Sequence, residues 1–281
     1  MRLHAARVCR QRALTTTMVF LSDLSGLWRR SLLIGPDGRT DTTTEVYWLQ
    51  GPSLYADLRL PRGRRKLGPS RCLRDLDWPM LRFLARQEGF FGHLDVSGTI
   101  AHWHRTFDYQ PQTGAADKGR LEFEGDILIE HGVEWPYLEH WRREPQPAQI
   151  AVAMRLLDVS SSAEGCLVAA GDAFIYARGR SEPLPANTDL AQLVENSPSL
   201  ATAQDLFDCE ISFGRREGAA WRIERSSLPF REGCLLGPAL DAAPATLSVD
   251  DLSPEGEPTR RRWRIGAWES LPASAPENWF P

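Results

Sequence analysis

Short segments that alternate apolar and polar residues, separated by turns containing glycine or proline, constrain the fold of this chain most strongly. Glu45–Gln50 and residues 53–60 flank Gly51-Pro52, which is the pattern of a β-hairpin. Gly26–Ile34 has the same character and ends at a Gly-Pro-Asp-Gly turn, where proline fixes φ and glycine accepts a positive φ. Similar segments follow along the chain, so the pattern predicts an all-β protein. The other expected strands are 91–96, 99–109, 121–124, 127–131, 137–143, 151–159, two within 166–178, 207–214, 219–226 and 260–268.

Helical spacing of apolar residues interrupts this pattern once in each half of the chain. Residues 76–87 predict a short amphipathic helix, and residues 189–195 predict another, introduced by Asn187 and Thr188 as capping residues. The order strand, hairpin, helix, hairpin, closing strand therefore occurs twice. Many antiparallel strands with short turns, and one short helix in each half, predict two tandem lipocalin-like antiparallel β-barrels. One continuous larger barrel is the alternative.

The chain divides into three parts by composition. Residues 1–17 carry four arginines and no acidic residue, which is typical of a mitochondrial transit peptide or of a non-native extension ahead of Met18. We expect this extension to be disordered. The proline-containing stretch 145–147 is the best linker candidate. We therefore predict a first barrel at 18–146, which carries the candidate site, and a second barrel at 147–281.

Composition and missing motifs narrow the function. The chain has no run of about 18 apolar residues, so no membrane-spanning helix is expected. The formal net charge of −4 gives no electrostatic reason to expect a nucleic-acid partner. The five cysteines are scattered without a Cys-x-x-Cys pair, which indicates reduced thiols of a cytoplasmic protein and no metal site. The sequence contains neither a phosphate-binding glycine loop nor a Gly-x-Ser-x-Gly motif, so no cofactor is expected.

The strand at 53–60 carries the first candidate site. Period two places Tyr55, Asp57 and Arg59 on one face, while leucine and alanine residues occupy the other. On a solvent-facing strand, the three residues would form an ordinary polar face with a weak ion pair. On a strand that faces a barrel lumen, they would form a preassembled polar site that orients a carboxylate or carbonyl ligand. We predict a pocket at these residues, bordered by a histidine of the next-but-one strand.

The histidine-bearing strand carries the second candidate site, and its two faces compete for the barrel interior. His102 and His104 share one face with Asp108, whereas Trp103 and Arg105 share the other. Histidines at i and i+2 on a strand suit proton transfer or a metal ion. The structural alternative is a hydrogen-bonded histidine beside a tryptophan.

The strands that follow add further candidates for the barrel lining. Glu130 lies on one of them, and Trp141 shares a face with Glu139 on the next. A tryptophan-lined interior suits a flat apolar or aromatic ligand, and the alternative is that the aromatic rings simply fill the barrel. If the histidine face points outward, the predicted site shifts to Arg59, Arg105 and Trp141.

Four short motifs occur in a fixed order. They are the hairpin 45–59 with its aromatic-x-Asp-aliphatic-Arg end, the Trp/His-rich strand 101–108 that ends in Asp, the Glu-x-Trp-Arg sequence in 137–143, and the strand 263–268. In this order they resemble the Hri-type tandem-barrel proteins of fungi and their bacterial relatives, over most of 28–268. The resemblance implies two lipocalin-like barrels in tandem, and it implies no defined biochemical activity.

The sequence as a whole predicts a cytoplasmic lipocalin-like protein whose first barrel binds a small aromatic or lipid-like ligand, with arginines available for an anionic group on it. Cofactor-free acid–base chemistry of the lyase or isomerase type is the catalytic form of this prediction. The alternatives are a non-catalytic protein-interaction module with filled barrels, and a metal- or haem-binding barrel that uses His102 and His104. We expect a small-molecule ligand and neither a nucleic-acid nor a membrane partner. The predicted catalytic residues are His102, His104 and Asp57, and the predicted ligand-binding residues are Tyr55, Arg59, Trp103, Arg105, Glu130 and Trp141.

Overall fold

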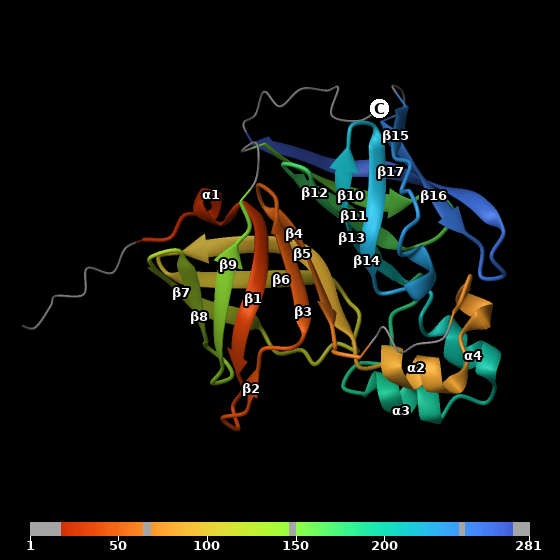
Figure 1. Cartoon of the computed structure of the whole chain (residues 1–281), viewed down its shortest axis with the longest axis horizontal. Coiled ribbons are helices and arrows are strands. Elements are labelled where there is room, and N and C mark those ends of the chain that lie inside the picture. The colour runs from red at the N-terminus through yellow and green to blue at the C-terminus, as the bar shows by residue number, and fades with distance from the viewer. Residues whose placement is uncertain (1–17, 64–68, 146–149, 242–244, 272–281) are drawn as a thin grey trace, which may run out of the picture.

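The computed structural model describes residues 18–63, 69–145, 150–241 and 245–271. The expected extension at 1–17 and most of the expected linker at 145–147 lie outside these residues. In the described part, antiparallel strands form two sheets that lie side by side, one from each half of the chain (Figure 1). The prediction of a mainly β protein with few and short helices is confirmed.

The first sheet closes into a barrel. Its strands are β1 (Gly26–Ile34), β2 (Thr40–Asp41), β3 (Glu45–Gln50), β4 (Leu54–Leu60), β5 (Glu88–Ser97), β6 (Ile100–Asp108), β7 (Asp117–Glu124), β8 (Ile127–Gly132) and β9 (Leu138–Arg143). Strands β3 to β9 pair in sequence order, and β1 pairs with both β3 and β9. This double pairing closes a ring of eight strands, while β2 pairs with the far end of β1 outside the ring.

The second sheet is a half-barrel. Its strands are β10 (Ala151–Asp158), β11 (Glu164–Ala170), β12 (Ala173–Arg178), β13 (Glu210–Glu217), β14 (Ala220–Ser226), β15 (Ala239–Asp241), β16 (Thr246–Leu252) and β17 (Pro258–Leu271). The sheet order is β14-β13-β12-β11-β10-β17-β16-β15, so β14 and β15 are its edges. Ile223 N donates to Cys234 O at 2.9 Å, and Asp250 N donates to Leu236 O at 2.8 Å. The segment around Cys234 therefore connects β14 to β16 without forming a strand, and the expected second barrel is more open than the first.

The described residues also form four short α-helices. They are α1 (Leu21–Leu24), α2 (Trp78–Leu84), α3 (Leu190–Glu195) and α4 (Leu200–Asp205). Asp77 caps α2 and Asp189 caps α3, because each carboxylate accepts a hydrogen bond from a backbone N–H of the first turn. The cap of α3 is thus Asp189 rather than the expected Asn187 and Thr188. Helix α4 is an additional element that the sequence did not predict. None of these described helices has the length and apolar character needed to cross a membrane.

Strand alternation divides the buried side chains into three layers. One layer fills the barrel, a second lies between the two sheets, and a third covers the inner face of the half-barrel around Trp263. In β4, Tyr55 and Asp57 point into the barrel, whereas Ala56 and Leu58 point toward the second sheet. Both faces of β4 are therefore buried, although one of them is polar.

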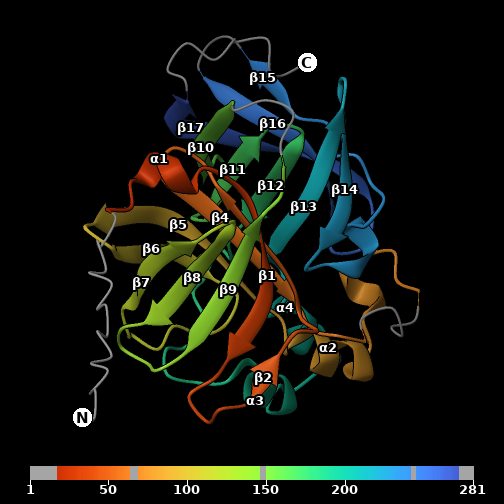
Figure 2. The same ribbon diagram turned by 60° about the vertical axis from the view of Figure 1, so that its left-hand side comes forward.

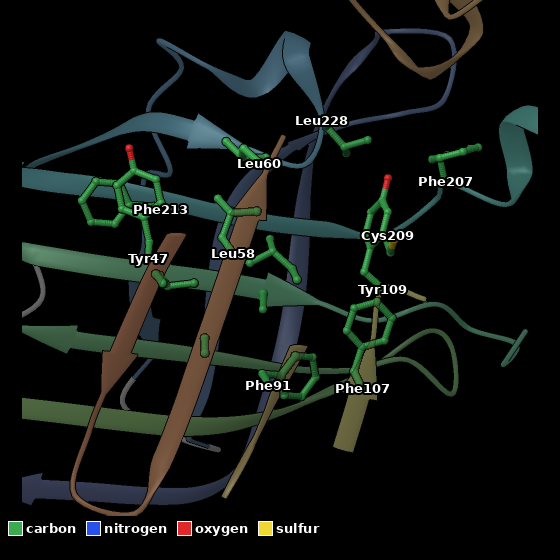
Figure 3. Packing of buried hydrophobic residues seen from close by; sticks show 14 of the residues in the cluster. Tyr47, Leu58, Leu60, Phe91, Phe107, Tyr109, Phe207, Cys209, Phe213 and Leu228 are labelled. Atoms are coloured by element: carbon green, nitrogen blue, oxygen red, sulfur yellow. The ribbon is translucent and has the colours of Figure 1, made fainter. Parts of the chain in front are cut away.

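The layer between the two sheets is a continuous apolar core (Figure 3). Tyr47 of β3 stacks on Phe213 of β13 with ring centroids 4.2 Å apart. Glycine is needed at Gly51 because a Cβ there would lie 2.8 Å from Ala153 Cβ. Helices α2, α3 and α4 lie together at one edge of this layer and contribute to it (Figure 1). The two units share one core, so we expect them to fold together rather than independently.

The two ends of the barrel differ in chemistry. Helix α1 covers one end, and the turn between β1 and β2 lies at the other (Figures 1 and 2). Val19 and Leu24 are buried among the interior side chains, and Trp28 Nε1 donates to Leu24 O at 2.7 Å. The end under α1 is therefore plugged by apolar residues, which leaves the polar lumen side chains toward the opposite end.

Candidate functional site

A cavity of about 250 Å³ lies in the barrel lumen. Gly35 and Pro36 of the turn after β1 line it, so the cavity extends to the end of the barrel opposite α1. Its wall combines aromatic rings with ionisable groups. The aromatic lining residues are Trp48, Phe90, Trp103, Tyr137 and Trp141. The charged or acidic lining residues are Asp57, Arg59, Arg105, Asp117, Glu130 and Glu139, and Tyr137 is also ionisable.

Every second side chain of a strand points to the same face, and this alternation places these residues in one lumen. In β4, the alternation that points Leu58 at the second sheet points Asp57 and Arg59 inward. In β8 and β9, Glu130 and Glu139 are direct cross-strand partners, so two carboxyl groups lie side by side in the cavity wall.

Three tryptophans form the aromatic part of the wall. Trp48 makes edge-to-face contacts with Trp103 and Trp141, with ring centroids 5.7 Å and 5.4 Å apart. Phe90 lies under Arg105, whose guanidinium carbon is 3.7 Å from the ring centroid. The three tryptophans and Phe90 are buried, whereas the side chain of Arg105 is 32% exposed. The wall therefore offers fixed ring surfaces, which suit stacking or cation–π contact with a ligand.

Carboxyl groups outnumber guanidinium groups in the cavity. Four carboxyl-bearing residues and two arginines line it. Arg59 Nε donates to Asp57 Oδ1 at 2.9 Å, and the other lining arginine, Arg105, donates to Asp117 at 2.7 Å and to Asp108 at 2.5 Å. Both lining arginines are thus already engaged, and carboxyl groups remain in excess of guanidinium groups among the lining residues.

Among the carboxyl groups of the site, Glu130 has the most strongly shifted pKa. Its side chain accepts hydrogen bonds from Tyr137 Oη at 2.6 Å and from Trp141 Nε1 at 3.0 Å. Burial in the barrel and the neighbouring Glu139 nevertheless raise the pKa of Glu130 to about 8. At neutral pH this carboxyl group is therefore mainly protonated in the folded chain.

Glu139 is held by arginines instead. Arg30 Nη1 lies 2.6 Å from Glu139 Oε1, and Arg59 Nη1 lies 3.7 Å from the same oxygen. Burial also raises the pKa of Asp57 to about 6, although Arg59 opposes the shift. The cavity thus contains neighbouring carboxyl groups in different charge environments, which is common where proteins bind or transfer protons and charged ligands.

The structure places six of the nine predicted site residues in the cavity wall. These residues are Asp57, Arg59, Trp103, Arg105, Glu130 and Trp141. Tyr55 is completely buried in the same barrel but does not line the cavity, and within the described residues its hydroxyl group has no hydrogen-bond partner.

His102 and His104 lie outside the lumen. Trp103 and Arg105 take the inward positions of β6, so the alternating histidines occupy the outer face of the barrel. The structure therefore does not bring either histidine together with Asp57. Burial, His104 and Lys118 lower the pKa of His102, which keeps it neutral near pH 7.

A β-bulge also changes the expected pattern at the end of β6. Phe91 pairs with Phe107, but Gly92 pairs with Arg105, so Thr106 is an extra residue in β6. The expected shared face of Asp108 with the histidines is wrong for this reason, because the bulge swings Asp108 to Arg105. Glycine is required at Gly92, where a Cβ would lie 1.8 Å from His104 O.

Sequence reasoning missed several residues that complete the site. Arg30 alternates with Trp28 along β1, and this period-two signal would have placed it in the lumen. Asp117 begins β7, whereas the sequence placed it in the loop before the next strand. Tyr137 and Glu139 were not among the nine predicted site residues, although the sequence placed both on the strand of Trp141 and placed Glu139 on the same face as Trp141.

No protein-family model matches the chain, and no curated protein matches it either. Among solved structures, the chain is similar to the uncharacterized protein YLR301w from Saccharomyces cerevisiae. The two share 10% sequence identity, the match covers 86% of this chain and 98% of that chain, and the TM-score is 0.48.

Proposed function

We propose that the first barrel binds a small organic cation with an aromatic or apolar body. The observation that carries this proposal is the excess of carboxyl groups inside an aromatic wall, with Glu130 hydrogen-bonded by both Tyr137 and Trp141. Ring faces attract cations, and this attraction is strongest where water is excluded. A carboxylate at the same place completes a site for an amine or a quaternary ammonium group.

The cavity size sets the ligand class. An apolar cavity of about 150 Å³ holds one benzene molecule. The lumen cavity of about 250 Å³ therefore has room for one ring and a short charged arm. Larger lipid-like ligands would require the barrel end near Pro36 to open.

The charge of the ligand follows from the pairs already formed. An anionic group, which the arginines suggested from the sequence, would have to displace Asp57 from Arg59 or Asp117 from Arg105. A cation would instead interact with Glu130 and allow it to ionise. Because the pKa of Glu130 is raised to about 8, cation binding at neutral pH should release a proton.

The test compares two probes that share one ring and carry opposite charges. Benzyltrimethylammonium and 3-phenylpropionate are titrated into the full chain by calorimetry, in two buffers with different ionisation enthalpies. We expect the cation to bind with release of up to one proton from the protein. The released proton cannot come from the probe, because benzyltrimethylammonium has no titratable group. Equal or tighter binding of the carboxylate probe would contradict the proposal.

Matched variants locate the binding. Glu130→Gln should keep the fold and abolish the proton release. Glu122→Gln is the control, since Glu122 lies on the adjacent strand but half exposed and paired with His131. Proton release that persists in Glu130→Gln would place the titrating group elsewhere.

A catalytic form of the same site would use Glu130 as the proton donor. The observation that favours it is a mainly protonated carboxyl group in the same cavity as arginine-bound carboxylates. His102 and His104 lie outside the cavity, so we move the proposed proton transfer from them to Glu130. For a substrate turned over here, Glu130→Gln should lower kcat about 10²–10⁴-fold, while His102→Ala leaves it unchanged.

The finer predictions from the sequence stay predictions beside this proposal. They are membership of the Hri-type family, the lipocalin-like class of both units and the cytoplasmic location.

A further inference from the structure

Three imidazoles and a carboxylate cluster on the outer face of β5 and β6. His93 lies directly opposite His104 across the two strands, and Asp95 lies opposite His102. The rings of His93 and His104 are stacked, with centroids 4.4 Å apart and planes 6° apart. Directly opposed residues on one face of a sheet have Cβ atoms about 4.5–5.5 Å apart, so the ladder itself holds these side chains together.

The distances between the polar atoms are close to those of a metal centre. His104 Nε2 lies 3.1 Å from Asp95 Oδ2, and His93 Nε2 lies 3.9 Å from the same oxygen. Candidate ligand atoms of the three residues all lie within 4.8 Å of one another, and no other group in the described residues does so. Tetrahedral zinc with bonds of about 2.0–2.1 Å requires ligand atoms about 3.3 Å apart, which small side-chain rotations would supply.

We propose that His93, Asp95 and His104 bind a divalent transition-metal ion, with Zn²⁺ as the best fit. Imidazole and carboxylate are zinc ligands, and water completes the coordination where three protein ligands are present. The side chains of His93, His104 and Asp95 are 50%, 34% and 71% exposed, so an ion can reach them from solvent. The β-sheet positions all three without any loop residue.

This proposal does not depend on the proposed function of the lumen. The metal would sit on the opposite side of β6 from Trp103 and Arg105, whose side chains line the cavity. Binding of an organic cation inside the barrel and of a metal ion outside it can therefore be measured separately.

Zinc binding to the full chain tests the proposal. The protein is dialysed against a chelator and then against buffer, and Zn²⁺ is titrated by calorimetry; Co²⁺ gives a visible absorption spectrum that reports the ligand set. His93→Ala, His104→Ala and Asp95→Asn each remove one ligand. His131→Ala is the matched control, because His131 Nε2 lies 2.9 Å from Glu122 Oε1 in a comparable pair outside this cluster.

We expect one Zn²⁺ per cluster, with affinity at least tenfold lower in each ligand variant and unchanged in His131→Ala. Groups that only orient metal ligands are typically worth about 10–100-fold in affinity, so losing a ligand should cost no less than the lower value. All three residues are on the barrel surface, and circular dichroism checks that the variants fold. Absence of zinc binding, or binding to His93→Ala and His104→Ala that is as strong as binding to wild type, would overturn the proposal.

Discussion

Replacing Glu130 by Gln should make the chain less sensitive to high pH. Burial and Glu139 raise the pKa of Glu130 from 4.5 to about 8 in the folded state, while the unfolded chain keeps the ordinary value. Between these two pH values the folded state holds a proton that the unfolded state has lost. The free energy of unfolding therefore falls as pH rises through this window. At about 1.4 kcal/mol per pKa unit, the full effect is roughly 5 kcal/mol.

Urea unfolding of wild type and Glu130→Gln at pH 5 and pH 9 measures this difference. Gln keeps the shape of the side chain and can still accept from Tyr137 or Trp141, but it cannot ionise. We expect the two proteins to have similar stabilities at pH 5 and the variant to be several kcal/mol more stable than wild type at pH 9. Glu122→Gln, with its half-exposed carboxyl group, should follow wild type. If the stability difference between Glu130→Gln and wild type does not change with pH, Glu130 is not protonated in the fold.

Three further predictions follow from the packing. Arg59→Ala should destabilise the fold by roughly 3–5 kcal/mol, measured by urea unfolding at pH 8, because it leaves the buried Asp57 without its partner. Arg120→Ala on the surface should change stability by less than about 0.5 kcal/mol. Equal effects of the two substitutions would contradict the importance of the buried Arg59–Asp57 pair. Trp103→Ala should lower the free energy of unfolding by about 3–5 kcal/mol and remove benzyltrimethylammonium binding. Unchanged binding would exclude a role of the aromatic wall in binding this cation. A fragment covering 18–145 should aggregate or bind a hydrophobic dye, because it exposes the apolar layer between the sheets, and a monomer that unfolds cooperatively would show that this layer is dispensable.

Much of the first sheet could be predicted from alternation and turn residues. Gly26–Ile34 and Glu45–Gln50 are strands with the expected bounds, and the expected helix at 76–87 contains α2. Strand β16 was not predicted, because Thr246–Leu252 carries adjacent aspartates, although it forms a local hairpin with β17. The openness of the second unit was not predictable either, since the segment around Cys234 bonds to both β14 and β16 without forming a strand.

The site could be predicted only up to a choice between faces. Alternation showed that Tyr55, Asp57 and Arg59 share one face of β4, but it does not say which face meets the lumen. In this chain the apolar face, including Leu58, points out of the barrel and is buried by the second sheet. The usual rule that apolar residues point inward therefore fails for β4, because its outer face is also an interface. The bulge at Thr106 is similarly a property of the pairing with β5 and not of the β6 sequence alone.

Burying the carboxyl groups of the lumen lowers the stability of the fold, and a bound cation would offset this loss. Trp48, Trp103 and Trp141 would fill a barrel without any acid among them, yet Asp57 and Glu130 are buried with raised pKa values. Carboxyl groups whose pKa values rise on burial reduce stability at neutral and higher pH. Departures of this kind from a well-packed apolar core occur in proteins mainly at functional sites. A cation in the cavity would let Glu130 ionise against a neighbouring positive charge. The increase in the free energy of unfolding on ligand binding should therefore grow as pH rises toward 8. This increase should also depend on the charge of the ligand rather than on its ring alone.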